Sequence, residues 1–403
     1  MQHFITGIYI EKLRHLTDID IVLDSKKKQH LLITGKNGSG KTSLLLAIAK
    51  YLNAINRSEL NMHNIKHKKL PNHTGNEWEN LENLKKEKNQ ASVFACNNGI
   101  EIELKKGNEI DSLYAKGDFI TAFFPAHRKT TIVRPTGVVN VKLQKSYGIN
   151  DSPSDVLLKY MIHLKTQQSY ARNEGDVSVV DKIQKWFERF EKALQTLLDN
   201  DTISLVYDYK EYNFKIQEKE RVTFRFDELS DGYSSLINIV SDLILRMDKN
   251  WLLKDNLSSY DVEGIVLIDE LETHLHIELQ KKILPFLTEF FPRIQFIVTT
   301  HSPYILTSIA NAKCYDLENK VELENLSLYS SEDIAEAYFN VDEYSIEMRN
   351  KMERYRCLLQ KDILSEEERA ERAELRMLFK KNSAGINREV QQIIDEIESS
   401  RMG

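Results

Sequence analysis

Residues 31–42 read Leu-Leu-Ile-Thr-Gly-Lys-Asn-Gly-Ser-Gly-Lys-Thr, an apolar run followed by a glycine-rich loop that ends in Lys41 and Thr42. The spacing of the outer glycines and of the Lys-Thr pair is that of a phosphate-binding loop. The apolar run predicts a strand over 30–34, and the leucines and isoleucine of 43–52 recur at helical spacing. Strand, glycine loop and helix in this order are the context that such a loop requires, and they predict a sheet flanked by helices.

The chemistry of this loop predicts that it binds the phosphates of a nucleotide. Glycines let the backbone turn so that several N–H groups point at phosphate oxygens, and the start of the helix adds a favourable dipole. We expect Lys41 to contact the β- and γ-phosphates and Thr42 to be a ligand of Mg²⁺. The residues expected to bind the nucleotide here are Gly35, Asn37, Gly38, Ser39, Gly40, Lys41, Thr42 and Ser43.

A second apolar run, 265–268, ends in two adjacent carboxylates, Asp269 and Glu270. Open α/β sheets place their ligands at the carboxyl ends of the strands, so this pair is expected beside the phosphate loop. We predict that Asp269 holds Mg²⁺, directly or through water. We predict that Glu270 orients or deprotonates the water that attacks the γ-phosphate.

Two further motifs stand at spacings that suit the same site. Ser230 and Gly232 open a helix predicted over 234–247, and a serine–glycine helix start is a second anion-binding terminus. His301 follows a strand predicted over 295–299, where the next parallel strand would end beside Glu270. We expect His301 to contact the γ-phosphate and to take part in catalysis together with Glu270 and Lys41.

Composition bounds the class of protein. The 403 residues are 41% hydrophobic and 29% charged, a soluble globular mixture. No run of 18 apolar residues occurs and the N-terminus lacks a signal-peptide pattern, so we expect no membrane contact. Three widely spaced cysteines form neither a disulfide framework nor a zinc pattern, and the sequence therefore predicts a cytoplasmic protein.

The charge is unevenly spread along the chain. Residues 1–150 carry 23 basic and 14 acidic side chains, whereas the rest of the chain has a net charge of −15. A basic part is typical both of proteins that bind an anion and of proteins with solvated loops. DNA is therefore a candidate partner: His127, Arg128, Lys129 and Arg134 either line a phosphate-facing groove, reach the nucleotide or stay solvated.

The order of these motifs carries a family resemblance. A phosphate loop, Leu-Ser-Asp-Gly at 229–232, an apolar strand with Asp-Glu, and Thr-His at 300–301 resemble the ABC-type ATPase superfamily. GKNGSGKT (35–42), LIDELETHLHIELQ (267–280) and FPRIQFIVTTHSP (291–303) are similar, more narrowly, to the RecF/OLD-like branch of AAA-labelled ATPases. That branch includes the ATPases of prokaryotic anti-phage defence pairs.

The resemblance implies a fold and an assembly. The implied fold class is α/β: a P-loop ABC-type ATPase head with a mixed or parallel central sheet, a β-rich N-terminal part and an inserted helical lobe. The implied assembly is a homodimer or a larger complex in which two heads hold two ATP molecules between them. Ser230 and Gly232 of one copy would then face the γ-phosphate held by the other.

The patterns along the sequence divide the chain into four expected parts, and the resemblance implies a biological role. The expected parts are an N-terminal part of the head with the phosphate loop and a basic insertion (1–150), a helical lobe (151–202), a C-terminal part of the head (203–318) and a helical tail (319–403). In the tail, Ser365 and Glu368 are spaced as a capping box at a helix start. ATP-dependent pairing would sense a trigger and control a separate effector protein, such as a nuclease, in anti-phage defence, with ATP hydrolysis slow or regulated by the partner.

Departures from the family pattern keep alternatives open. Residues 123–128 stand where a glutamine-bearing loop is expected and contain no glutamine, which favours an ATP-gated scaffold that does not hydrolyse. Glu270 argues for hydrolysis, because a scaffold needs no water-activating carboxylate. A DNA-repair ATPase of RecF-like type is the other alternative. His274 and His276 are spaced poorly for zinc, and the resemblance implies that they belong, with Glu272, to a loop that faces the second copy.

Overall fold

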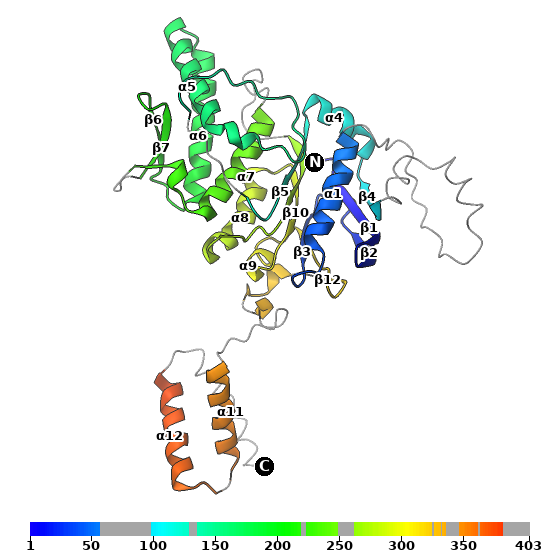
Figure 1. Ribbon diagram of the computed structural model, residues 1–403, viewed down its shortest axis with the longest axis vertical. Helices are drawn as coiled ribbons and strands as arrows, with labels where there is room; N and C mark the ends of the chain where they lie inside the picture. Colours follow the sequence, from blue (N-terminus) through cyan, green and yellow to red (C-terminus); the bar gives the residue numbers. More distant parts are fainter. Residues whose placement is uncertain are drawn as a thin grey trace, which may run out of the picture. The chain divides into compact units, whose positions relative to one another are not determined.

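The computed structural model describes residues 1–56, 98–128, 135–218, 223–248, 262–324, 326–331, 333–335, 346–361 and 363–381 (Figure 1). The chain forms two compact units, Met1–Ser331 and Glu332–Gly403. Residues 57–97, in the part of the chain expected to carry the basic insertion, lie outside the described residues, as do Lys129 and Arg134. Within the part of the chain that is described, no helix is both long and apolar enough to cross a membrane.

The first unit is built on a six-stranded mixed sheet, as the fold class predicted. Five neighbouring strands are parallel, and the edge strand β12 is antiparallel to β11. In the order in which they lie, the strands are β12 Val321–Leu323, β11 Ala312–Asp316, β3 His30–Thr34, β10 Ile294–Thr299, β9 Glu263–Ile268 and β5 Phe119–Phe124.

The central strands are buried on both faces, which explains their apolar sequences. Every residue of β3, β9 and β10 is buried. Continuous apolar runs are typical of parallel strands that helices cover on both sides. Among the described residues, the helices of the head are α1 Lys41–Asn56, α4 Ile110–Lys116, α7 Asp231–Met247, α8 Ile277–Phe290 and α9 Pro303–Leu306, with short 3-10 turns at Gly107–Glu109, Pro153–Val156, Phe226–Glu228 and Leu326–Leu328.

A second, antiparallel sheet packs against the helix that follows the phosphate loop. Its order is β2-β1-β4, with bounds β2 Leu16–Val22, β1 Ile5–Leu13 and β4 Ile100–Leu104. One buried cluster contains apolar side chains of this sheet, of α1 and of the central sheet. Because a buried leucine or isoleucine contributes about 1.5–3 kcal/mol relative to an exposed one, this cluster fixes α1 and the loop before it firmly.

The inserted lobe is a helical hairpin with a small sheet. The hairpin consists of α5 Leu157–Glu174 and α6 Val177–Leu197, and the small sheet of β6 Ser204–Asp208, β7 Asn213–Gln217 and β8 Phe224–Arg225. Gly175 ends α5 in the left-handed region with φ 76°, and the Asp176 carboxylate caps α6 by accepting the Val179 N–H. Aromatic rings of α6, β7 and the turn before α7, packed face to face or edge to face, hold the lobe together: Trp186, Phe187, Phe190, Phe214 and Phe226.

The second unit contains a hairpin of α11 Ile346–Gln360 and α12 Glu366–Lys381. The rings of Tyr355 and Phe379 meet edge to face at 5.5 Å in its small core. At the start of α12, the Ser365 hydroxyl accepts the Glu368 N–H, and the Glu368 carboxylate accepts the Ser365 N–H. The capping box predicted at this position is therefore confirmed.

Candidate nucleotide-binding site

The candidate site lies at the carboxyl edge of three neighbouring parallel strands. The phosphate loop follows β3, the acidic pair follows β9, and His301 follows β10, which lies between them. The strands end level with one another, because Ile33 pairs with Thr299 and Ile268 with Val298. Motifs more than 200 residues apart in the sequence therefore meet at one edge, where open α/β sheets bind ligands.

Asp269 is held between two hydroxyl groups. The Thr42 hydroxyl donates to Asp269 Oδ2 at 2.8 Å, and the Thr299 hydroxyl donates to Asp269 Oδ1 at 2.6 Å. The Thr42 hydroxyl and the Asp269 carboxylate are hard oxygen ligands of the kind that Mg²⁺ prefers. The described residues contain no group of three His, Cys, Asp or Glu side chains that could hold a metal alone, so phosphate or water oxygens would complete the ligand set of such an ion.

The backbone of the phosphate loop turns at glycines that adopt positive φ angles. Gly35, Gly38 and Gly40 have φ angles of 133°, 84° and 97°, which L side chains rarely adopt. Lys41 is buried and folds back over the loop, donating from Nζ to the carbonyls of Gly35 at 2.7 Å and Lys36 at 3.0 Å. Burial lowers the pKa of Lys41, and the carboxylates of the site oppose that shift.

Glu270 adopts an unusual backbone conformation. Its φ is 45°, in the left-handed region that costs a residue with a side chain about 1 kcal/mol or more. The Glu270 N–H donates to the Thr299 hydroxyl at 2.8 Å, so the same threonine contacts both members of the acidic pair. The direction of the Glu270 side chain is thus set by a turn that its neighbours hold in place.

His301 is half-buried and presents one unpaired ring nitrogen. Its Nε2 is buried and has no hydrogen-bond partner among the described residues. Burial lowers the pKa of His301, the nearby charge of Lys41 lowers it further, and Glu270 opposes the shift. The imidazole is therefore neutral near pH 7 and can offer an Nε2–H to a phosphate oxygen.

Glu272 contacts the backbone of His301, a contact that the sequence did not predict. Its Oε1 accepts the backbone N–H of His301 at 2.5 Å, and its Oε2 is buried without a partner in the described part of the chain. Burial raises the pKa of the Glu272 carboxyl, and the hydrogen bonds to it act in the opposite direction. Sequence reasoning grouped this residue with a subunit-facing loop, but its carboxylate turns inward and positions the histidine. His274 and His276, by contrast, are exposed.

The signature residues Ser230 and Gly232 contact a part of the same chain other than the phosphate loop. Ser230 precedes α7 without capping it through its hydroxyl, and a Cβ on Gly232 would lie 2.4 Å from the carbonyl oxygen of His274. The start of α7 therefore packs closely on the loop after the acidic pair. Among the described residues, no hydrogen bond joins Ser230 or Gly232 to the phosphate loop.

The guanidinium of Arg128 lies in a different environment from the solvated one that the sequence left open. Its guanidinium points into the head, where it donates to the Ser235 hydroxyl and to the carbonyls of Asp269 and Glu270. Burial lowers the pKa of Arg128 to about 10, although the surrounding carboxylates oppose the shift. The alternative in which Arg128 stays solvated is wrong, because tertiary contacts use its donors inside the protein. Contact of this residue with DNA or nucleotide stays a prediction.

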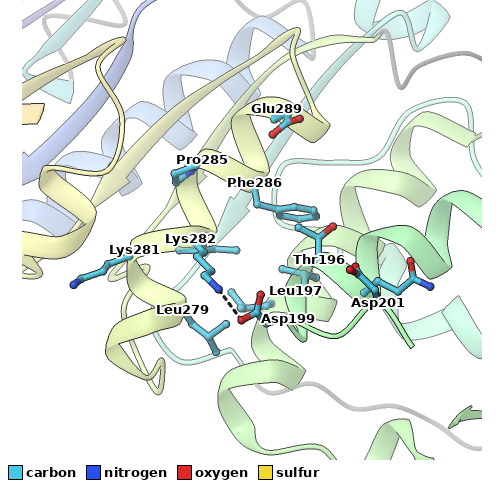
Figure 2. A pocket seen from close by; sticks show the side chains of 13 residues that line it. Thr196, Leu197, Asp199, Asp201, Leu279, Lys281, Lys282, Pro285, Phe286 and Glu289 are labelled. Carbon is cyan, nitrogen blue, oxygen red and sulfur yellow. Dashed lines mark hydrogen bonds and ion pairs between the residues drawn. The ribbon is translucent and has the colours of Figure 1, made fainter. Parts of the chain in front are cut away.

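A separate cavity of about 440 Å³ lies between the end of α6 and α8 (Figure 2). Charges of both signs line it together with Phe286 and Leu279, and the Lys282 ammonium pairs with the Asp199 carboxylate at 2.7 Å across it. None of its lining residues belongs to the nucleotide site, so the cavity adds nothing to the candidate chemistry.

The fold and the edge of the sheet described above form a P-loop α/β head, the fold class that the sequence predicted. Residues 147–307 match the family model described as "AAA domain, putative AbiEii toxin, Type IV TA system". Of the curated relatives, "Septu protein PtuA" of Bacillus mycoides (strain KBAB4) is 27% identical over 334 residues, 80% of this chain and 41% of the relative. "Retron Vc95 probable ATPase" of Vibrio cholerae serotype O1 biovar El Tor is 24% identical over 360 residues, 71% of this chain and 68% of the relative.

These similarities confirm the resemblance to ABC-type ATPases of anti-phage defence type. The chain spans less than half the length of the PtuA relative, and 19% of "Retron Ec83 probable ATPase" of Escherichia coli, to which it is 36% identical over 104 residues. Among solved structures, "Crystal structure of the SmcHead bound to the C-winged helix domain of ScpA" matches 81% of this chain and 100% of that chain, with 12% identity and a TM-score of 0.41.

Proposed function

We propose that this chain binds and hydrolyses ATP, and that ATP draws two copies together as a switch for a separate effector protein in anti-phage defence. The observation that carries the proposal is the asymmetry of the site. Lys41, Thr42, Asp269, Glu270 and His301 converge on one edge of the sheet, whereas the signature start of α7 packs on the loop at His274 of its own chain. A second copy would supply the missing signature.

In the proposed reaction each residue has a defined task. Lys41 and the N–H groups of the phosphate loop bind the β- and γ-phosphates. Thr42 and Asp269 would hold Mg²⁺, which neutralises phosphate charge when it is bound. Glu270 accepts a proton from the water that attacks the γ-phosphorus, the bond to the ADP oxygen breaks, and His301 donates a hydrogen bond to a γ-phosphate oxygen. These roles are part of the proposal.

The control of an effector, such as a nuclease, is supported by the relatives. Similarity to a Septu PtuA and to retron ATPases, added to the resemblance to ATPases of anti-phage defence pairs, favours a switch over an enzyme that acts alone. Pairing fits this role because only the closed pair would contact the γ-phosphate from both sides, so ATP shifts the population towards it. The inward position of Arg128 leaves DNA binding without a supporting observation among the described residues.

The dependence of turnover on protein concentration tests the proposal. If two copies complete each site, turnover per subunit rises with concentration and levels off once the pairs are formed. The measurement is phosphate release across dilutions, with the oligomeric state followed by sedimentation at the same concentrations. Constant turnover per subunit in samples that sediment as monomers would contradict the shared site.

The pH profile tests the neutral state of His301. Because the pKa of His301 lies below its ordinary value of 6.5, the neutral form predominates from pH 8 to pH 6.5, and the protonated form can predominate only in more acidic solution. We therefore expect that the protonation of His301 causes no change in ATP turnover in that range. His301→Gln, which keeps an N–H donor, should retain this flat profile, while His301→Ala should lose about 10²-fold in kcat. A wild-type turnover that rises as the pH falls from 8 to 6.5, and does not rise in His301→Gln, would show that the histidine acts as a cation.

A further inference from the structure

Arg128 connects helix α7 to the turn after β9, two parts of the head whose relative position matters for the proposed reaction. It follows β5, the strand beside β9, and its Nε donates to the Ser235 hydroxyl at 2.7 Å. On the other side, its two terminal nitrogens donate to the carbonyls of Asp269 at 2.9 Å and Glu270 at 3.1 Å. One guanidinium therefore bridges α7 and the turn that carries the acidic pair.

The bridge acts directly on the backbone of Glu270. That residue has a φ of 45°, and its N–H is already held by the Thr299 hydroxyl. Arg128 holds the carbonyl on the other side of the same residue and the carbonyl before it. A planar guanidinium can reach two successive carbonyls at once, whereas a lysine ammonium is a single compact charge on a flexible stem. The direction of the Glu270 side chain therefore depends on Arg128.

At its other end, the Arg128 bridge contacts α7, the helix whose start carries the signature residues. Ser235 lies on the first turns of α7, the helix that Ser230 and Gly232 open. The same helix start rests on the carbonyl of His274, so α7, Arg128 and the turn after β9 form one contact set. A displacement at the start of α7 would reach the Glu270 backbone through the Ser235 hydroxyl.

We propose that Arg128 is a positioning residue that couples the signature end of α7 to Glu270 of the same chain. The inference rests on the proposed function, because only in a pair does the signature of one copy face the nucleotide of the other. Nucleotide bound at one site would then orient Glu270 at the second site. Hydrolysis by the pair is accordingly cooperative in ATP, and Arg128 with Ser235 carries that cooperativity.

Two substitutions separate positioning from folding. Ser235→Ala removes the link to α7 and leaves the contacts of Arg128 with the turn, so we expect the Hill coefficient for ATP to fall to about 1 with a modest loss of kcat. Arg128→Lys is expected to lower kcat by roughly 10-fold to 100-fold while KM and nucleotide affinity change by less than about twofold. The matched control is Ser241→Ala, because Ser241 is a fully buried serine of the same helix whose hydroxyl has no partner among the described residues.

The readouts are phosphate release as a function of ATP, equilibrium binding of a fluorescent ATP analogue, and thermal unfolding of each variant. Wild-type cooperativity in Ser235→Ala, a wild-type pair that hydrolyses without cooperativity, or an equal loss in Ser241→Ala would each overturn the coupling. If the wild-type protein neither pairs nor hydrolyses ATP, the proposed function fails and the inference falls with it. If it does both and Ser235→Ala behaves like the wild type, only the inference fails.

Discussion

Replacing Glu270 with glutamine is expected to lower ATP turnover by roughly 10²-fold to 10⁴-fold while ATP still binds. Glutamine keeps the size of the side chain and cannot accept a proton from water, so the loss falls on the chemical step. The backbone contacts of residue 270 with Thr299 and Arg128 do not involve its carboxylate and remain available. Single-turnover phosphate release and nucleotide binding on the same sample measure the two quantities separately.

Glu278→Gln is the matched control for this change. Glu278 is an exposed glutamate in the first turn of α8, outside the site, and its substitution should leave turnover within about twofold. Wild-type turnover in Glu270→Gln would rule out Glu270 as the base. The same variant tested in cells addresses the scaffold alternative, because full protection without hydrolysis would show that ATP binding alone is the switch.

Replacing Lys41 with alanine is expected to weaken ATP binding by about 10²-fold or more, since a buried ammonium makes charge-assisted hydrogen bonds with phosphate oxygens. The ammonium is buried and already faces the loop, with two carbonyl partners that a phosphate would replace. The measurement is equilibrium binding of labelled ATP, and turnover should be lost in parallel at cellular ATP concentrations.

Lys36→Ala gives the control within the same loop. The Lys36 side chain is 85% exposed and pairs with the Glu318 carboxylate at 2.8 Å, on the outer side of the loop. An exposed ion pair contributes little, so ATP affinity should change by less than about threefold. Equal losses for the two lysines would mean that the loop responds to net charge and that Lys41 has no specific role.

The sequence predicted those parts of the site that depend on local pattern. Strand β3 has the predicted bounds of 30–34, and strand β10 ends at the predicted residue 299, because apolar periodicity acts over a few residues. Helix α7 begins at Asp231, three residues before the predicted start, since the pattern of apolar residues begins after the first turn. A sheet flanked by helices followed from the order of strand, loop and helix, whereas the mixed or parallel central sheet was what the family resemblance implied.

The inward contacts of Arg128 and Glu272 could not be predicted from the sequence. Both residues sit in polar segments and carry a charge, which in a sequence favours exposure. Each is instead turned inward by partners far away in the chain: Arg128 by the carbonyls after β9, and Glu272 by the backbone of His301. No periodicity or spacing encodes such contacts, because they depend on which strands become neighbours. The missing glutamine between residues 123 and 128 was a sign that this segment differs, without showing what replaces it.

A mixing experiment tests most directly whether two copies share each nucleotide. Lys41→Ala removes the phosphate contact of its own chain, and Ser230→Arg blocks the signature offered to the other chain, so each variant alone should be inactive. In an equal mixture, half of the pairs combine both variants and hold one intact site, which predicts recovery of up to about a quarter of wild-type turnover. When Ser235→Ala is also present in both chains, so that the active site does not depend on nucleotide at the other site, a mixture that forms mixed pairs and stays as inactive as its components would contradict the shared site.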